Sequence, residues 1–503
     1  MPMLSEIRST AWPACPAPFN LAAHVLARAD ALPDKIALQL LRPSGAERWS
    51  YGRLVRAVRG IAGGLAAQRL SPGAKILLRI DNSVDFPLAF LGAVGAGHLP
   101  VAAPAGLTGP EVTRLCQTLA PELIIAAPGI SLPDAPCPVL TTAEMRGLAD
   151  GREGAFALGP PDRPAYLVYT SGTSGAPRAV LHAHRAIWAR QMMRDGWYGL
   201  TESDRVLHAG AMNWTFTLGT GLFDPWTIGA TALIPAAGTT PAQLPLYLRR
   251  FDATLFAAAP GVYRQMLKAH PSLDLPRLRH GLTAGEALSN PVRAAWAAAT
   301  GKPLYEAFGL SECSTFLSAS PASGEAALRV QPGRTVAILG PDGASVPRGT
   351  AGVIGIHHTD PGLFLTYAGA EAEAADKFAG DWFLTGDMGE MNVDGSIRTL
   401  GRADEMTNAG GYRVAPQEVE AALAACDGAG DVAACELSLG PGRTIIGAFF
   451  TGPATPEALA AHAKTVLAPY KCPRQYERLP QLPLTATGKV NRRILREKWT
   501  IKT

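Results

Sequence analysis

Short apolar runs alternate with longer helical patterns along most of the first 400 residues. Residues 75–80 and 123–127 are short apolar runs next to turn-forming residues, which is typical of buried strands. Residues 85–95 carry a longer apolar pattern that predicts a helix. A strand at 254–258, followed by a helix around 262–268, repeats the alternation. This pattern predicts an α/β architecture with buried sheets.

The most apolar stretch of the chain covers residues 86–106 and is interrupted by His98, Pro100 and Pro104. These interruptions argue against a transmembrane segment and predict a buried helix followed by a strand. The first residues lack a charged segment followed by an apolar one, so we expect no secretory signal.

Composition narrows the class of protein. The chain has 503 residues, of which 47% are hydrophobic and 17% charged, so it can bury a large core and form at least two domains. The net charge of +4, without a basic tail, gives a nucleic-acid partner no electrostatic support. Seven cysteines lie scattered without a CxxC pair, which argues against a disulfide framework and predicts a cytoplasmic protein.

A turn-rich region at residues 401–411 precedes a stretch of about 100 residues, long enough for a small separate domain. Residues 416–425 are expected to form a helix that starts at Pro416. The segment 480–496 carries a Gly-Lys turn followed by a basic helix pattern.

An apolar strand at residues 165–169 runs into a loop of hydroxyl residues and glycines. The loop consists of Thr170, Ser171, Gly172, Thr173, Ser174 and Gly175, and Pro177 and Arg178 follow it. Hydroxyls and glycine-freed backbone N–H groups are what a loop needs to wrap phosphate oxygens. The spacing is not that of a Walker loop. Taken alone, the segment also fits a flexible surface loop.

This loop resembles the signature of the adenylate-forming (AMP-binding) superfamily, which includes acyl-CoA synthetases, luciferases and the adenylation domains of peptide synthetases. The usual ending is Pro-Lys-Gly, whereas here it is Pro177-Arg178-Ala179. Arg178 keeps the positive charge but presents a planar fork. Three further signatures follow in the family's order, so the resemblance extends over residues 164–496.

The second signature combines TAGEALS (283–289) with YEAFGLSEC (305–313). The resemblance implies that the residues around the adenine are Gly285, Glu286, Ala287, Glu306 and Phe308, with Phe308 as the stacking ring. It also implies that Ser311 places a hydroxyl near the α-phosphate and that Glu312 holds magnesium. Alone, these segments also suit an ordinary turn and a solvated carboxylate.

The third signature spans residues 383–414. The resemblance implies that Asp387 binds the ribose hydroxyls and that Arg402 contacts the nucleotide. It places a hinge at Asp404, and it brings Gly410 and Gly411 near the pantetheine arm of coenzyme A. The same segment independently predicts a hairpin with an Asp-Gly turn at 394–395.

The fourth signature, LPLTATGKVNRRIL (482–495), contains Lys489. The resemblance implies that Lys489 contacts the substrate carboxylate and the nucleotide oxygens during adenylation, together with Arg178, Ser311 and Glu312. It also suggests a lysine acetyltransferase acting on Lys489 and a homodimer. Without the other signatures, Lys489 would be read as a turn lysine before a basic helix.

The family resemblance implies a large N-terminal adenylation domain at residues 1–402, with packed sheets flanked by helices and a small β subdomain. A hinge at 403–404 would connect it to a small, mobile α+β domain at 405–503. The implied enzyme uses ATP, Mg²⁺ and coenzyme A. It first forms an acyl-adenylate and then, after rotation at the hinge, transfers the acyl group to the thiol.

The resemblance implies that the acid binds near residues 208–226, where Trp214 stands at the place of a pocket aromatic in acyl-CoA synthetases. Amino-acid-activating members of the family usually carry an aspartate just before this position to pair with the α-ammonium group. Residues 210–213 contain no carboxylate, which argues against an amino-acid substrate. Acetate-specific relatives carry tryptophan at the position of Gly309, so its absence favours a medium-chain or aromatic acid. We interpret the histidine pairs 182/184 and 357/358 as structural or surface residues.

Two alternatives remain open at this point. The chain could activate an acid and load it onto a carrier protein instead of coenzyme A. A non-enzymatic scaffold is disfavoured because Asp387, Arg402 and Lys489 are all present.

Overall fold

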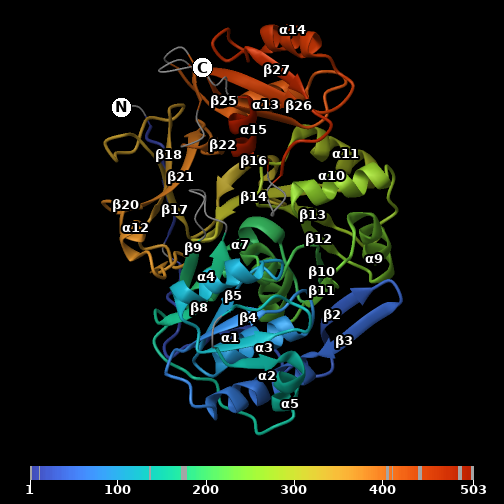
Figure 1. Ribbon diagram of the computed structural model, residues 1–503, viewed down its shortest axis with the longest axis vertical. Coiled ribbons are helices and arrows are strands. Elements are labelled where there is room, and N and C mark those ends of the chain that lie inside the picture. Colours follow the sequence, from blue (N-terminus) through green and yellow to red (C-terminus); the bar gives the residue numbers. More distant parts are fainter. Residues whose placement is uncertain are drawn as a thin grey trace.

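The chain is described here from a computed structural model of residues 1–503 (Figure 1). The structure describes residues 3–10, 12–134, 137–170, 178–403, 407–409, 412–439, 444–484 and 490–499.

A run of parallel strands forms the first sheet of the large domain. Their order across the sheet is β2 (Ile36–Arg42), β11 (Thr231–Pro235), β10 (Arg205–His208), β12 (Leu255–Ala258), β13 (His280–Thr283) and β14 (Leu304–Leu310). Most of these strands are nearly continuous apolar runs and are covered on both faces, as parallel sheets require. The predicted strand at 254–258 is confirmed as β12.

The second sheet carries the strand that leads into the predicted phosphate loop. Its order is β7 (Val139–Thr141), β6 (Leu123–Ala126), β4 (Lys75–Arg79), β5 (Leu99–Ala102), β8 (Pro164–Thr170), β9 (Arg178–Ala183) and β19 (Thr366–Tyr367). The strands from β7 to β8 are parallel, whereas β9 and β19 pair antiparallel. The sequence predictions of β4, β6 and β8 are confirmed.

Helices fill the space between the two sheets and cover their outer faces (Figure 1). The inner layer contains α1 (Leu21–Val25), α2 (Tyr51–Ala66), α3 (Asp85–Gly95) and α8 (Asp224–Ile228). The outer layers contain α4 (Gly109–Leu119) on the second sheet, and α9 (Leu244–Arg250), α10 (Pro260–Ala269) and α11 (Asn290–Thr300) on the first. Every residue of α3 is buried, because it contacts both sheets. Its bounds match the predicted helix.

An antiparallel extension continues the first sheet beyond β14. It runs through β15 (Ser314–Ser320), β16 (Gly324–Val330), β22 (Ile397–Arg402), β21 (Trp382–Met391), β18 (Ala351–His357), β17 (Thr335–Leu339) and β1 (Glu6–Arg8). The predicted Asp394-Gly395 turn connects β21 to β22, and Gly395 has a φ of 82° that favours glycine. This part corresponds to the expected small β subdomain.

A small α+β domain follows and lies at the top of the molecule in Figure 1. Its sheet consists of β25 (Val432–Ser438), β26 (Thr444–Phe450) and β27 (Gln475–Arg478). One face packs against α13 (Pro416–Ala424) and α14 (Pro456–Val466), and the other against α15 (Arg492–Trp499). The predicted helix that starts at Pro416 is confirmed.

The described helices include none that is both long and apolar enough to cross a membrane. The apolar stretch at 86–106 instead forms the buried helix α3 followed by β5, as predicted.

A buried ion pair fastens the antiparallel extension. Arg334 donates to Asp360, and the two side chains are 0% and 1% exposed. Arg334 also donates to the carbonyl of Thr315 at 3.1 Å, while Asp360 accepts from the N–H of Gly362 at 2.7 Å. The carboxylate of Asp360 raises the pKa of Arg334 against the opposing effect of burial. The guanidinium therefore stays charged inside the protein.

Asp360→Ala should destabilise the large domain by about 3–5 kcal/mol, because it leaves the Arg334 charge buried without its partner. The measurement is urea unfolding monitored by tryptophan fluorescence. Asp274→Ala is the matched control, since it breaks an exposed pair with Arg249 and should change the free energy of unfolding by less than about 1 kcal/mol. Equal losses in the two variants would contradict the structural role of Asp360.

Candidate active site

The predicted phosphate loop connects two neighbouring antiparallel strands. Thr170, at the end of β8, lies opposite Arg178, at the start of β9. Ser171, Gly172, Thr173, Ser174 and Gly175 lie outside the described residues. Arg178 Nε donates to Glu373 Oε2 at 2.8 Å, and its Nη2 contacts the same oxygen. Glu373 belongs to the short helix α12 (Glu371–Ala375), and its side chain is 53% exposed.

The predicted adenine segment is the turn after β13. Gly285 has a φ of 97°, which favours glycine, and a Cβ there would come within 2.6 Å of the Trp214 ring. Glu286 and Ala287 follow in the same turn. Trp214 therefore packs against the segment expected to hold adenine, and it also meets Phe216 edge to face at 5.2 Å.

Glu306 supports this turn from β14. Its Oε1 accepts from the N–H of Leu288 at 2.8 Å, and its Oε2 lies 3.3 Å from Arg293 Nη2. Burial raises the pKa of Glu306, while the hydrogen bond and the arginine act in the opposite direction. The geometry thus gives Glu306 a role in positioning the turn, and its contact with adenine stays a prediction.

Phe308, Ser311 and Glu312 lie at the end of β14 and in the turn that leads into β15. Phe308 packs edge to face against Phe316 at 5.6 Å. Glu312 Oε1 accepts from the Tyr367 hydroxyl at 2.6 Å, and the backbone carbonyl of Glu312 accepts from the N–H of Phe364 at 2.6 Å.

The carboxylate of Glu312 has the chemistry to hold magnesium, and this role stays a prediction. Within the described part of the chain, its second carboxylate oxygen has no hydrogen-bond partner. One carboxylate oxygen combined with substrate phosphates is a common way to bind this hard cation.

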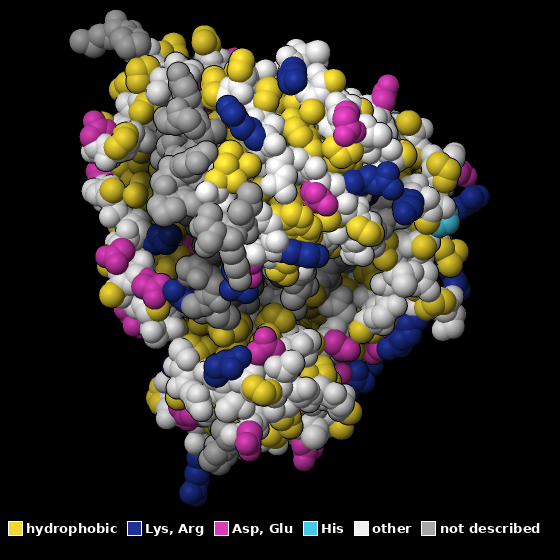
Figure 2. All heavy atoms as spheres, turned by 45° about the horizontal axis from the view of Figure 1, so that its top comes forward, with side chains coloured by type: hydrophobic (Ala, Val, Ile, Leu, Met, Phe, Trp, Pro, Cys, Tyr) yellow, Lys and Arg dark blue, Asp and Glu magenta, His cyan; other side chains and the backbone are white. Residues whose placement is uncertain are grey.

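Charged groups converge around Tyr367. Burial and the Glu312 carboxylate raise its pKa, while the charges of Arg178 and Arg402 act to lower it. Figure 2 shows a hollow in one face of the molecule, with both Lys or Arg (dark blue) and Asp or Glu (magenta) side chains beside it. A nearly neutral protein therefore presents a local surface suited to anionic substrates.

Asp387 and Arg402 are direct cross-strand partners on β21 and β22. Arg402 Nη1 donates to the carbonyl of Thr385 at 2.9 Å and lies 3.4 Å from Asp387 Oδ2. Gly386 lets the guanidinium approach, because a Cβ there would come within 2.7 Å of Arg402 Nη2. The structure thus brings together the two predicted nucleotide contacts.

Four further predicted positions cannot be placed. Asp404, Gly410, Gly411 and Lys489 lie outside the described residues, so their roles stay predictions.

The structure adds a constraint at Gly309, whose place in the acyl pocket stays a prediction. A Cβ on Gly309 would lie 2.2 Å from the carbonyl oxygen of Ser314 and 2.4 Å from the Cα of Thr315. The pairing of β14 with β15, which is irregular at Phe308/Gly309, therefore requires the glycine. Gly309 faces the backbone of β15 and does not open a wall of the cavity described next. A tryptophan substitution there would disrupt the strand pairing, so it cannot test acid size.

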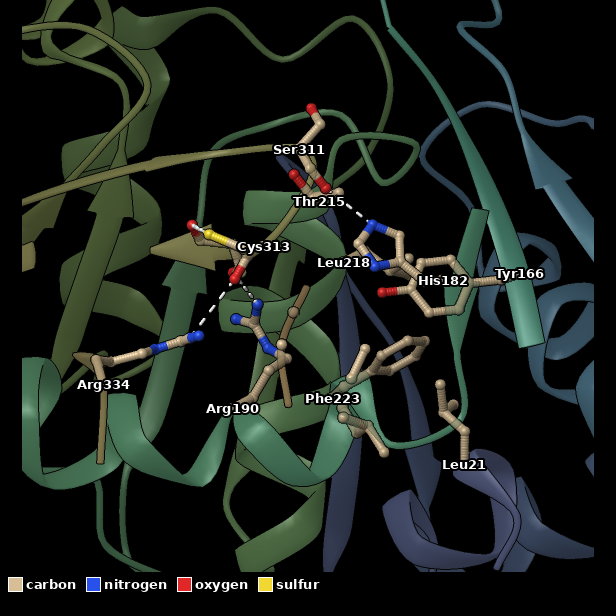
Figure 3. A pocket seen from close by; sticks show the side chains of 15 residues that line it. Leu21, Tyr166, His182, Arg190, Thr215, Leu218, Phe223, Ser311, Cys313 and Arg334 are labelled. Carbon is tan, nitrogen blue, oxygen red and sulfur yellow. Dashed lines mark hydrogen bonds between the residues drawn. The ribbon is translucent and has the colours of Figure 1, made fainter. Parts of the chain in front are cut away.

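A small cavity of about 20 Å³ lies beside the Ser311 segment (Figure 3). Neither Trp214 nor Gly309 lines it. Its walls include Tyr166 of β8, His182 of β9 and Arg190, which follows the short helix α6 (Ala186–Ala189).

Arg190 forms a buried pair with Asp224 at the start of α8. Nε donates to Asp224 Oδ1 at 2.8 Å and Nη2 to Oδ2 at 2.6 Å, and the two side chains are 9% and 7% exposed. Gly219, in the π-helical segment η2 (Thr217–Phe223), makes room for the guanidinium, since a Cβ there would meet its Cζ at 2.1 Å. Sequence reasoning missed this pair because no motif links the two residues.

The histidines singled out in the sequence lie at structural or surface positions. His182 Nε2 bonds to the carbonyl of Ser311 at 2.8 Å, and His184 Nδ1 accepts from the N–H of Leu21 at 2.9 Å. His358 is exposed beside Asp381, and the half-buried His357 bonds to the hydroxyl of Thr359 at 2.8 Å.

Comparison with known proteins identifies the family. The family model of the AMP-binding enzyme matches residues 25–368, and that of the AMP-binding enzyme C-terminal domain matches residues 418–489. The chain belongs to the AMP-binding enzyme family. Within this family it is an acid–thiol ligase of the AMP-forming type. Acid–CoA ligases of this family use ATP, Mg²⁺ and coenzyme A.

Several AMP-binding enzymes are similar over most of their length. Benzoate–CoA ligase of Thauera aromatica is 32% identical over 465 residues, covering 85% of this chain and 86% of that protein. Mitochondrial acyl-coenzyme A synthetase ACSM5 of Mus musculus is 30% identical over 512 residues, covering 93% and 87%. The solved benzoate CoA ligase from Burkholderia xenovorans LB400 is 27% identical, with a TM-score of 0.84 and coverage of 95% and 100%.

Glu373→Gln should lower the KM for ATP roughly two- to fivefold, the range expected when an exposed ion pair is removed. The Glu373 carboxylate competes with ATP phosphates for Arg178, and the amide competes less. Initial rates of pyrophosphate release at varied ATP give the KM. Asp376→Asn, which removes an exposed charge just after the same helix, is the control. A higher KM in Glu373→Gln would show that the pair holds Arg178 ready for ATP.

Proposed function

We propose that this protein is an ATP-dependent carboxylate–CoA ligase that acts on an aromatic or medium-chain acid. The observation that carries the proposal is the convergence of Arg178, Glu312 and Arg402 around Tyr367, with Asp387 beside Arg402. The names of the relatives, benzoate–CoA ligase and acyl-coenzyme A synthetase, support the acid class.

The first half-reaction joins two anions, ATP and the acid, so it depends on cations and oriented donors. Arg178 supplies a fixed positive charge next to the loop at 171–177, and Lys489 adds a second. Asp387 binds the ribose hydroxyls, with Arg402 beside it. Magnesium held by Glu312 would neutralise phosphate charge. Carboxylate attack on the α-phosphorus then releases pyrophosphate and leaves the acyl-adenylate.

The second half-reaction is assigned to a different orientation of the small domain. We place the large domain at residues 1–402, the hinge at 403–404 and the small domain at 405–503. Contacts between α10 and the small domain include an exposed pair, with Arg264 Nη1 3.2 Å from Asp431 Oδ1. Such a pair is weak enough to break during rotation. Gly410 and Gly411 would then approach the thiol-bearing arm of coenzyme A.

A reducing compartment, the cytoplasm, suits this activity. All seven cysteines lie among the described residues and all are free thiols.

The direct test is a pyrophosphate-release screen over benzoate, hexanoate and acetate, with and without coenzyme A. We expect benzoate or hexanoate to be favoured over acetate, and the acyl-CoA to form in stoichiometric amount. Adenylate formation without acyl-CoA would point to the carrier-protein alternative, tested by adding a phosphopantetheinylated carrier protein. If none of the acids releases pyrophosphate, the proposal fails.

Lys489→Ala should separate the two half-reactions. Adenylation should fall by at least about a hundredfold, because a charge aimed at the transition state is lost, whereas thioester formation from supplied acyl-AMP persists. Arg493→Ala, which removes an exposed cation of α15, is the control. Acetylation of Lys489 by a lysine acetyltransferase would stop adenylation by the same route. Equal loss of both half-reactions would contradict the assignment.

A further inference from the structure

The cavity beside Ser311 has polar groups at its wall and apolar side chains around them. Figure 3 shows Ser311 at the upper end, Tyr166 and His182 on one side, and Arg190, Phe223 and Leu21 below. Its volume of about 20 Å³ holds a single oxygen- or nitrogen-sized group and not a ring. Of an acid bound beside Ser311, no more than a small substituent would fit into it.

His182 offers an acceptor to this cavity. Its Nε2–H donates to the Ser311 carbonyl at 2.8 Å. Burial lowers the pKa of His182 to about 4, so the ring is neutral and Nδ1 carries a lone pair. Within the described chain, Nδ1 has no hydrogen-bond partner, although the side chain is buried. An unpaired buried acceptor is costly, and a donor from a ligand would satisfy it.

Tyr166 offers a donor next to that acceptor. Its ring stacks on His182 with the centroids 4.9 Å apart and the planes at 16°. Burial raises the pKa of Tyr166 to about 12, so the hydroxyl keeps its proton. Among the residues that the structure describes, this hydroxyl has no hydrogen-bond partner. Figure 3 shows the Tyr166 hydroxyl pointing into the cavity.

Arg190 makes the floor polar without giving it a net charge. Four of its five N–H groups donate to Asp224, Thr220 and Ser314, which leaves one N–H on Nη1 without a partner in the described chain. Asp224 neutralises the guanidinium at close range. A second carboxylate on the acid would therefore find no net positive charge at the Arg190–Asp224 pair. A neutral hydrogen-bonding group would find a donor in the Tyr166 hydroxyl and an acceptor in His182 Nδ1.

We propose that this cavity selects an acid that carries a hydroxyl substituent. The substituent donates to His182 Nδ1 and accepts from the Tyr166 hydroxyl, while the rest of the acid extends toward the phosphate side of Ser311. Tyr166 and His182 are thus specificity-determining residues. The inference rests on the proposed ligase activity and narrows its substrate class.

The test compares kcat/KM for benzoate, 3-hydroxybenzoate, 4-hydroxybenzoate and the two matching fluorobenzoates. One hydroxybenzoate should exceed benzoate by about tenfold, the gain expected from one or two buried hydrogen bonds. The matching fluorobenzoate, similar in size but unable to donate, should gain less than about threefold. Terephthalate, with its second carboxylate, should be poorer than benzoate.

Tyr166→Phe should reduce the ratio of kcat/KM for the favoured hydroxybenzoate to that for benzoate by about five- to tenfold. Tyr247→Phe is the matched control, because it also removes a buried hydroxyl without a partner but lies in the core around α9. That variant should keep the wild-type ratio. Melting temperatures establish whether both variants fold. If Tyr166→Phe does not fold, the comparison of hydroxybenzoates with fluorobenzoates on the wild-type enzyme still tests the inference.

Two outcomes would overturn the inference: equal kcat/KM for the hydroxyl and fluorine members of each pair, or an unchanged ratio in folded Tyr166→Phe. Either result would leave the ligase proposal intact as long as benzoate is converted to its CoA thioester. Failure of every acid in the series, in contrast, would count against the ligase proposal itself.

Discussion

The segment Ser311–Glu312 is held by three hydrogen bonds, two from strands of the second sheet and one from the segment that leads into β19. His182 bonds to the carbonyl of Ser311, Phe364 donates to the carbonyl of Glu312, and Tyr367 donates to the Glu312 carboxylate. Ser311 and Glu312 themselves follow β14 of the first sheet. These bonds therefore join the two sheets at the point where phosphate and metal chemistry is expected. Together with the shared core, they fix Glu312 relative to β9, the strand that carries Arg178.

Most of the fold could be predicted from local patterns in the sequence. The helix α3 could be predicted because its apolar side chains surround the axis, and β4, β6 and β12 because each is a short apolar run. Asp387 and Arg402 could be named from signatures alone, and the hairpin turn then made them neighbours. In each case the information lies within a few residues or in one contiguous motif.

Contacts between distant segments could not be predicted in the same way. Gly309 suggested an open acyl pocket, and the sequence did not show that its missing side chain also lets β15 approach. Glu306 suggested an adenine ligand, and the sequence did not show that it also accepts from the N–H of Leu288. The cavity wall at Tyr166, His182 and Arg190 arises only when β8, β9 and α6 meet. Burial and unpaired hydrogen-bonding atoms, which decide its chemistry, are properties of the packed chain.

The fit of Arg190 against Gly219 has a consequence for changing the specificity of this enzyme. The guanidinium occupies the space that a side chain at position 219 would need. Among the described residues, Asp224 is the one acid that accepts hydrogen bonds from it. Shortening Arg190 to enlarge the cavity would strand a buried carboxylate, and adding a side chain at Gly219 would displace the guanidinium. The three positions are thus structurally coupled. Enlarging this cavity for a bulkier substituent would require coordinated replacement of all three, a route that single-site libraries do not sample.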